Sequence, residues 1–572
     1  MLKVGQTEKV EITGYSSEGM GVCRIEGCAV FVPNAIRGEV CEVKVTHVSR
    51  NSAHGKIERV VVRSPHRISR VCPEAKLCGG CQLHHMDYAE ELNFKAQKVA
   101  DALTRLGGQS LPLEGKAAAP KALTDEVASD EAAGSSQQVT EFVAPAICRP
   151  DASPFTSQQA AESVAPAICR PDEAAGSRQH NTGDGSLCST NAFRISQSCT
   201  TQRTVPCVPS AVPITGAADI GAYRNKAQYP LATKNGKPIA GFYKNRTHEV
   251  VPIRRCAILP EVFDRVKDAV LRWAGEDRVS VYDETTGQGL LRHIYVRKGV
   301  VSGQIMVCLV VNGDRLPREN RLIHALHREI PGLASVILSV NRKNTNVVLG
   351  SEFRTLWGRD WIEDELCGFT FRLSPRSFYQ VNHDQAQRLY DKAVELADLH
   401  GTETVLDLYC GTGTITLALS RKAGRAVGVE VVPEAVEDAK QNAARNGVTN
   451  VEFFCADASE AARRFAQSLP PGGKVPPQGA DEGTSDDRPA GIDVIVVDPP
   501  RKGLAPEVVE AMTSMAPARI VYVSCDPATL ARDVKLLTQR GYALTHAEAF
   551  DLFPRTFHIE TVVSLSQLKS DV

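Results

Sequence analysis

The chain has 572 residues, with 66 basic and 67 acidic side chains that give a formal net charge of −1, and 42% of its residues are hydrophobic. This length allows several domains, and the composition is that of an ordinary globular protein. No apolar run approaches the roughly 20 residues of a membrane helix, and the first residues lack the apolar core of a signal peptide. We therefore expect a cytoplasmic protein, whose 17 cysteines serve as core, metal-binding or catalytic thiols rather than disulfides.

Residues 1–62 are predicted to form a small all-β domain. Apolar and polar residues alternate from Cys41 to Thr46, as in a strand with one buried face, and glycines separate short segments. These features favour a barrel of the OB type, a fold that often binds single-stranded nucleic acid. A purely structural β module is the alternative, but the basic residues between Lys56 and Arg70 favour RNA binding.

Three cysteines follow this domain closely: Cys72, Cys78 and Cys81. In a cytoplasmic chain such a cluster indicates a metal site. The two glycines between Cys78 and Cys81 let the backbone wrap closely, so that the thiolates can face one centre. Cys256 is the candidate for a fourth ligand. Four thiolates suit zinc or a 4Fe-4S cluster, and core thiols are a third possibility.

Residues 63–108 and 217–374 are predicted to form one mixed α/β central domain. Residues 88–106 have the pattern of an amphipathic helix ended by two glycines, and strands are expected within 292–311 and 335–350.

A basic segment lies within this domain. Between Tyr223 and Cys256, eight basic residues stand against Glu249 alone, and aromatic residues lie among them. Recognition of single-stranded RNA uses basic side chains for phosphates and aromatic rings for bases. We therefore expect an RNA-binding surface, with a solvated basic face as the alternative.

The central domain is interrupted by residues 109–216, which contain no Tyr or Trp and are rich in Ala, Ser, Pro and Gln. Within them, Val143–Asp151 is repeated as Val164–Asp172. Such a composition buries too little apolar surface to offset chain entropy, so we predict a disordered insertion. A shorter loop of the same kind is predicted near 470–491.

Residues 375–572 alternate between apolar strands and amphipathic helices, as in a doubly wound α/β domain. One strand ends at Tyr409 and runs through Cys410-Gly-Thr-Gly413 into a helix. The next strand ends at Glu430, whose carboxylate can accept both ribose hydroxyls of a nucleoside cofactor. The following strand leads to Asp457. The third glycine of a pyrophosphate-binding turn is missing, which favours S-adenosylmethionine over NAD.

Two further strands carry the residues around which the domain is organised. Apolar strands end at Asp498 and at Ser524, and Cys525 follows the second one directly. Open α/β sheets bind ligands at this edge. Asp526 and Pro527 can cap and start a helix, and a helix N-terminus lowers the pKa of a nearby thiol. This place favours a nucleophile over the alternative of a small buried hydrophobic residue.

With these residues in view, the chain resembles the RNA uracil-C5-methyltransferases, specifically the iron–sulfur branch that acts on 23S ribosomal RNA. The matching motifs, apart from the four cysteines, are Phe378-Tyr-Gln-Val-Asn382, Asp407-Leu-Tyr-Cys-Gly-Thr-Gly413, Asp498-Pro-Pro-Arg-Lys-Gly503, Ser524-Cys-Asp-Pro527 and Phe557-His-Ile-Glu-Thr561. The resemblance covers nearly all of the chain except the two insertions, and the large insertion departs from the family pattern.

The resemblance implies a fold and a site. The fold is a Rossmann-like methyltransferase domain, with an N-terminal OB-like barrel of the TRAM type and the central α/β domain. The cofactor S-adenosylmethionine would be held by Gln380, Tyr409, Glu430, Asp457 and Asp498. The resemblance also favours a 4Fe-4S cluster over zinc at the four cysteines. We expect a monomer that acts on RNA, with ribosomal RNA favoured.

The chemistry fits this resemblance. C5 of uracil is a poor nucleophile, and a thiolate that adds at C6 activates it. Cys525 is the predicted nucleophile. Glu560 is the predicted base that removes the C5 proton, and its alternative is a charged strand end. The uridine must leave its stack to be reached.

Other functions remain as alternatives. One is methylation of transfer RNA, and another is a non-catalytic RNA-binding protein. The third is an amino-group methyltransferase, which would place an aromatic residue where this chain has Arg501.

Overall fold

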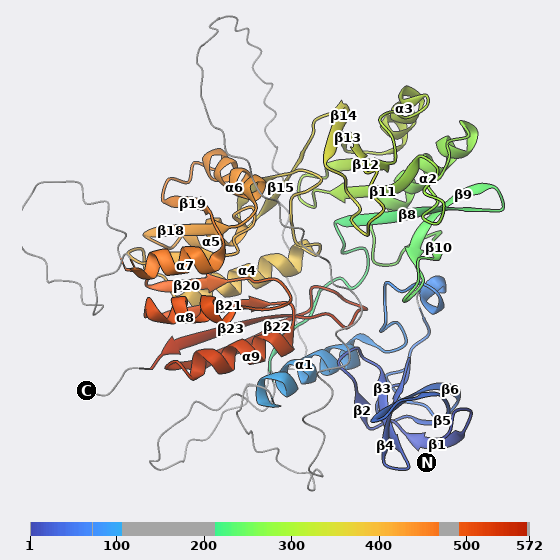
Figure 1. Ribbon diagram of the computed structural model, residues 1–572, viewed down its shortest axis with the longest axis horizontal. Helices are drawn as coiled ribbons and strands as arrows, with labels where there is room; N and C mark the ends of the chain where they lie inside the picture. Colours follow the sequence, from blue (N-terminus) through green and yellow to red (C-terminus); the bar gives the residue numbers. More distant parts are fainter. Residues whose placement is uncertain (1, 71, 106–211, 468–490, 569–572) are drawn as a thin grey trace, which may run out of the picture. The chain divides into compact units, whose positions relative to one another are not determined.

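The computed structural model describes residues 2–70, 72–105, 212–467 and 491–568 (Figure 1). Nearly all of the two insertions predicted to be disordered, 109–216 and 470–491, lies outside the described residues. Within the described ranges, no helix has the length and apolar character that crossing a membrane requires.

The N-terminal region is a six-stranded sheet in the order β1-β5-β6-β4-β3-β2. Its strands are β1 (Thr7–Glu11), β2 (Gly14–Tyr15), β3 (Gly21–Ile25), β4 (Cys28–Val32), β5 (Val40–Val48) and β6 (Ser52–Val62). The alternation predicted for β5 is confirmed, because Cys41, Val43 and Val45 lie in the core while the residues between them are partly exposed. The last strand ends at Val62, where the sequence places the end of this region.

The central region is a seven-stranded sheet in the order β10-β9-β8-β11-β12-β13-β14. Its strands are β8 (Lys226–Lys234), β9 (Lys237–Tyr243), β10 (Val250–Pro252), β11 (Leu291–Lys298), β12 (Ile305–Val311), β13 (Leu333–Val340) and β14 (Glu352–Gly358). Helices α2 (Glu261–Glu276) and α3 (Glu319–Glu329) cover it and share its core. A short 3-10 helix, η1 (Pro73–Lys76), precedes this region.

A strand expected within 335–350 is confirmed by β13, which ends at Val340. The chain turns there, because the side-chain amide of Asn341 donates to the carbonyls of Val347 at 2.7 Å and Val348 at 3.0 Å. β14 then returns antiparallel to β13.

The C-terminal region is an eight-stranded sheet in the order β19-β18-β17-β20-β21-β23-β22-β7. Its strands are β7 (Ile214–Thr215), β17 (Thr404–Leu408), β18 (Arg425–Glu430), β19 (Val451–Cys455), β20 (Val494–Val497), β21 (Arg519–Ser524), β22 (Tyr542–Phe550) and β23 (Glu560–Gln567). The first five in sheet order are parallel, and β23 is antiparallel to β21. The chain moves from β17 outwards to β19 and then returns to β20 on the other side, so the strand order reverses between β17 and β20.

Helices cover both faces of this sheet (Figure 1). One face packs against α4 (His383–Ala397), α5 (Thr414–Ser420) and α6 (Pro433–Arg445). The other packs against α1 (Tyr88–Arg105), α7 (Ala458–Gln467), α8 (Pro506–Ser514) and α9 (Pro527–Thr538). The strands are apolar on both faces, since Val405 and Leu406 enter the two different cores. A hairpin of β15 (Ile362–Leu366) and β16 (Phe369–Leu373) lies before α4.

The structure differs from the predicted domain division at two points. The sequence places α1 in the central domain, but its residues Val99 and Leu103 enter the same core as α8 and α9. The sequence places residues 212–216 in the insertion, but Ile214 and Thr215 form β7, which extends the sheet beside β22. The C-terminal region therefore includes two elements from the first half of the chain: β7 extends its sheet, and α1 packs on one face.

Candidate active site and cysteine-lined cavity

The predicted site residues of the C-terminal region gather at the carboxyl ends of its parallel strands. Tyr409 follows β17, Asp498 follows β20 and Cys525 follows β21. The first two flank the point where the strand order reverses, which is where open α/β sheets form a ligand crevice.

Cys525 lies between the end of β21 and the start of α9. The predicted helix cap is confirmed: the Asp526 carboxylate accepts from the amides of Ala528 at 2.9 Å and Thr529 at 3.0 Å. The expected lowering of the thiol pKa was wrong. Burial, followed by the charges of Glu560 and Asp498, raises the pKa of Cys525 to about 11. The cap itself carries a negative charge, which further opposes the effect of the helix N-terminus.

Strand register brings Glu560 next to Cys525. In the antiparallel pair of β21 and β23, Ser524 faces Thr561. Cys525, the residue just past the end of β21, therefore comes near Glu560, whose charge acts on the thiol. Glu560 is 3% exposed. Burial raises its pKa well above the ordinary range, the Asp498 charge adds to this rise, and Arg501 opposes it. The site thus joins a thiol to a carboxyl group that holds its proton strongly.

Two more buried carboxyl groups lie at the same edge. Burial raises the pKa of Asp498 to about 7. Burial also raises the pKa of Asp407 to about 7, although the Thr416 hydroxyl donates to its Oδ2 at 2.6 Å. Its Oδ1 is buried and has no hydrogen-bond partner among the described residues. Asp407 was given no role from the sequence, although an aspartate inside the apolar strand 404–408 was a visible signal.

The first predicted cofactor residues form a connected group around the glycine turn. Glu430 ends β18, and its carboxylate accepts the amides of Gly411 at 3.1 Å, Val431 at 2.9 Å and Val432 at 3.0 Å. Tyr409 has a φ of 70°, which is unusual for a residue with a side chain and is typical of functional sites. Val431 is 59% exposed, so an apolar surface adjoins this carboxylate.

Asp457 and Gln380 are two further predicted cofactor residues. Asp457 precedes α7, is exposed, and accepts the amide of Ser459 at 2.9 Å, and hydrogen bonds from Ser459 lower its pKa. Its charge acts on Tyr409, as does that of Glu430, so these three residues lie together. Gln380 is buried before α4, and its backbone carbonyl accepts from the Asn225 side chain at 2.8 Å. A carboxylate at a strand end, a glycine turn and an apolar rim are a donor set that fits a nucleoside cofactor without phosphates.

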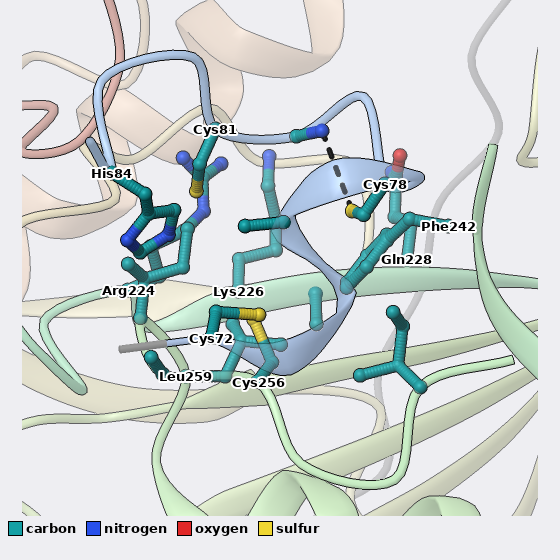
Figure 2. Close-up of a pocket in the computed structure, with 16 residues that line it drawn as sticks. Cys72, Cys78, Cys81, His84, Arg224, Lys226, Gln228, Phe242, Cys256 and Leu259 are labelled. Carbon is teal, nitrogen blue, oxygen red and sulfur yellow. Dashed lines mark hydrogen bonds between the residues drawn. The ribbon is translucent and has the colours of Figure 1, made fainter. Parts of the chain in front are cut away.

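The four predicted metal ligands line one cavity of about 280 Å³ (Figure 2). They are Cys72, Cys78, Cys81 and Cys256. Arg224 and Lys226 line the same cavity, as does His84. Across the described part of the chain, no three His, Cys, Asp or Glu side chains are arranged as metal ligands, so the thiols surround the cavity without converging on a point.

The chemistry of this cavity fits a thiolate-bound group. Burial raises the pKa of Cys256 to about 12, and the neighbouring thiols Cys72 and Cys78 add to the rise. The charge of Arg224 opposes the similar rise at Cys81. The predicted role of the glycines is supported at Gly79, where a Cβ atom would stand 3.0 Å from the Asn245 backbone. A metal centre that binds such thiols would deprotonate them and offset their mutual repulsion.

Comparisons with known proteins match both ends of the chain. The family described as tRNA (Uracil-5-)-methyltransferase matches residues 343–568, and the TRAM domain matches residues 2–57. An uncharacterized RNA methyltransferase of Clostridium tetani is 36% identical over 565 residues, which cover 99% of this chain and 97% of the relative. A similar protein of Halalkalibacterium halodurans is 35% identical, with 98% of each chain covered.

The solved structures include one with the same overall fold. The Pyrococcus abyssi tRNA (uracil-54, C5)-methyltransferase in complex with S-adenosyl-L-homocysteine has a TM-score of 0.62 at 22% identity. The similarity covers 98% of this chain and 100% of that one. The predicted fold class is confirmed by this match and by the TRAM domain.

Proposed function

Because this chain belongs to the family of S-adenosylmethionine-dependent RNA uracil-5-methyltransferases with a TRAM domain, we propose that it methylates C5 of uridine in 23S ribosomal RNA through a covalent bond to Cys525. The observation that carries the mechanism is the register of β21 and β23, which sets Cys525 beside the buried Glu560. A nucleophile and a base at adjacent positions are what addition to C6 and proton removal from C5 require.

In this proposal each side chain acts on the pyrimidine at a stated atom. The Cys525 sulfur forms a bond to C6, which makes C5 nucleophilic toward the methyl group. After methylation Glu560 must be in its ionised form to accept the proton from C5, and the Arg501 charge favours that form against burial. The electrons of the C5–H bond then restore the C5–C6 double bond and expel the sulfur from C6. The thiol must lose its proton first, because its raised pKa keeps it protonated at neutral pH. The Asp498 carboxyl group, with a pKa raised to about 7 and a charge that acts on this thiol, can accept that proton when ionised.

The remaining site residues hold the methyl donor. We assign the ribose of the cofactor to Glu430. The residues assigned to hold the rest of the cofactor are Gln380, Tyr409, Asp457 and Asp498. S-adenosylmethionine supplies an electrophilic methyl group when bound. The exposed apolar side chains of Val431 and Val432 adjoin Glu430 and suit the flat face of an adenine ring.

Two kinds of RNA are candidates for the methyl acceptor. Ribosomal RNA is favoured by the resemblance of the four cysteines to the cluster-bearing branch, and transfer RNA is the alternative. Release of tritium from RNA labelled at C5 of uridine tests the reaction, because C5 methylation expels that hydrogen. We expect release from ribosomal RNA that lacks 5-methyluridine. Release from transfer RNA alone would favour the alternative substrate, and methyl transfer without release would contradict the proposal.

We also propose that Cys72, Cys78, Cys81 and Cys256 bind a 4Fe-4S cluster that joins residues 72–81 to the central region. Protein purified without oxygen is expected to be brown and to carry about four irons per chain. Replacing Cys256 with serine should reduce the iron content, because one ligand is lost. The matched control is Cys367→Ser, a buried thiol in the turn between β15 and β16. Tightly bound zinc in place of iron would contradict the cluster.

A further inference from the structure

The loop of residues 551–558 lies just before β23, whose first residue is Glu560. The position of this loop therefore influences the position of the Glu560 side chain. The loop contains a strained residue: Arg555 has a φ of 71°, a left-handed conformation that costs free energy for a residue with a side chain. Such a conformation persists only when surrounding contacts hold it. Side chains and amides around the loop supply these contacts.

Successive carbonyls of the 551–558 loop each accept a hydrogen bond from a different part of the chain. The donors are Asn382 Nδ2 to Leu552 at 3.2 Å, Lys95 Nζ to Phe553 at 3.2 Å, Tyr223 Oη to Pro554 at 3.0 Å, and the amides of Gln82 and Leu83 to Arg555 at 3.0 Å each. Four consecutive peptide groups are thus fixed by residues that are remote in sequence. The loop has little freedom to move without breaking several of these bonds.

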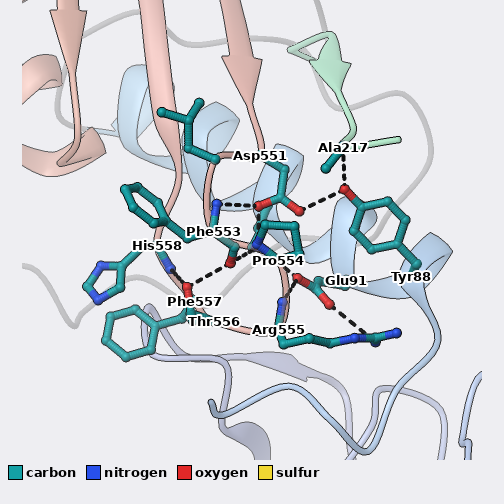
Figure 3. Close-up of polar contacts among 12 residues, drawn as sticks. Tyr88, Glu91, Ala217, Asp551, Phe553, Pro554, Arg555, Thr556, Phe557 and His558 are labelled. Atoms are coloured by element: carbon teal, nitrogen blue, oxygen red, sulfur yellow. Dashed lines mark hydrogen bonds and ion pairs between the residues drawn. The ribbon is translucent and has the colours of Figure 1, made fainter. Parts of the chain in front are cut away.

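A buried ion cluster holds the same loop from α1 (Figure 3). Lys95, Glu91 and Asp551 have fully buried side chains, and Lys95 Nζ lies 2.8 Å from Glu91 and 2.7 Å from Asp551. The Tyr88 hydroxyl donates to Asp551 at 2.9 Å, and the Arg555 amide donates to Glu91 at 2.6 Å. The second Glu91 oxygen, Oε2, accepts no hydrogen bond among the described residues but lies 3.5 Å from an Arg555 guanidinium nitrogen. Paired buried charges of this kind hold the loop in one arrangement.

The donors to Pro554 and Arg555 come from the two sides of the cysteine-lined cavity. Gln82 directly follows Cys81. Tyr223 directly precedes Arg224, whose side chain lines the cavity and whose amide donates to the Ile258 carbonyl at 3.1 Å, two residues after Cys256. Whatever fixes the four cysteines therefore also fixes the groups that hold the 551–558 loop.

We propose that Tyr223, together with the amides of Gln82 and Leu83, positions Glu560 for removal of the C5 proton, so that the cysteine-lined cavity acts on this step of the reaction. Tyr223 is a positioning residue, since it touches the loop and not the substrate. The inference rests on the proposed function. In this inference a bound cluster supports the step in which the C5 proton is removed and the bond between the Cys525 sulfur and C6 breaks. Addition of the thiol to C6 is not affected.

Replacing Tyr223 with phenylalanine tests this inference, because only the hydroxyl is removed. Losing one hydrogen bond to the loop should slow proton removal about fivefold. The methylated covalent intermediate should then accumulate on ordinary RNA as a denaturation-resistant protein–RNA band. Tyr88→Phe, which removes the bond to Asp551, should act in the same direction. The Cys256→Ser protein, with its iron content reduced, should also accumulate the band.

The matched control is Tyr229→Phe. The Tyr229 hydroxyl is buried in the central region and makes no hydrogen bond within the part of the chain that the structure describes, so its loss should leave the band unchanged. Equal slowing of methyl transfer and proton release in Tyr223→Phe, without accumulation, would overturn the inference, and so would unchanged kinetics. RNA containing 5-fluorouridine separates this result from failure of the proposed function, since the unaltered enzyme must form an adduct with it.

Discussion

Replacing Cys525 with alanine is expected to reduce methyl transfer by roughly 10⁴-fold or more, the scale seen when an enzyme loses its nucleophile. The reason is chemical, because without the sulfur–C6 bond the C5 carbon stays a poor nucleophile. The variant should fold normally, since the thiol is only partly buried. Methyl transfer from labelled S-adenosylmethionine measures the loss.

An adduct assay shows whether the loss arises from the bond itself. With 5-fluorouridine at the target, methylation can occur but no base can remove fluorine as a proton, so the unaltered enzyme should stay attached to the RNA. Cys525→Ala should form no adduct, whereas Cys367→Ala should form as much as the unaltered enzyme. An adduct that persists in Cys525→Ala would contradict the assignment of the nucleophile.

The pH dependence of adduct formation follows from the same thiol. Because the pKa of Cys525 is raised to about 11, the thiolate fraction of the free enzyme is small at neutral pH and grows as pH rises. The rate should therefore increase by up to about tenfold per unit through the neutral range. A rate that falls with rising pH would show that a protonated group limits addition.

Replacing Glu560 with glutamine is expected to slow turnover by about 10²- to 10⁴-fold, the usual contribution of a general base. Unlike the loss of Cys525, this change leaves addition and methylation possible and stalls only the final elimination. Ordinary RNA should therefore become trapped on the enzyme. The measurement is a denaturation-resistant protein–RNA band that requires S-adenosylmethionine.

Glutamine is a close match in size, so the buried site should keep its packing. A useful control is Glu548→Gln. The Glu548 carboxylate lies on β22, which is separated from β21 by β23, and it pairs with Lys392 of α4. It should turn over normally without a trapped band. Normal turnover in Glu560→Gln would instead move the base to another carboxyl group, with Asp498 the first to test.

Local chemistry in the sequence was sufficient to predict several parts of the site. Asp526 caps α9 as its position before Pro527 predicts, and Cys525 follows a buried strand. Glu430 ends the strand after the glycine turn, where its carboxylate accepts the amide of Gly411. Each of these features depends on residues within about twenty positions of one another, which is the range that spacing and capping rules describe.

Features that depend on distant residues were not predictable in the same way. No spacing rule pairs Ser524 with Thr561, so the adjacency of Cys525 and Glu560 came only from the family resemblance. The pKa of Cys525 was misjudged because burial and neighbouring carboxyl groups outweigh the helix N-terminus. The place of β7 was missed because a two-residue edge strand has no detectable period.

The pairing of Lys95 with Asp551 also bears on how the protein is made. These two residues are 456 positions apart, and the ribosome adds about 5 to 20 residues per second. Lys95 is therefore synthesised roughly 20 to 90 seconds before its partner exists. During that interval α1 lacks the C-terminal layer on which its apolar face packs. Until translation is nearly complete, the apolar face of α1 therefore lacks its native partner, a state in which folding chains are prone to aggregation.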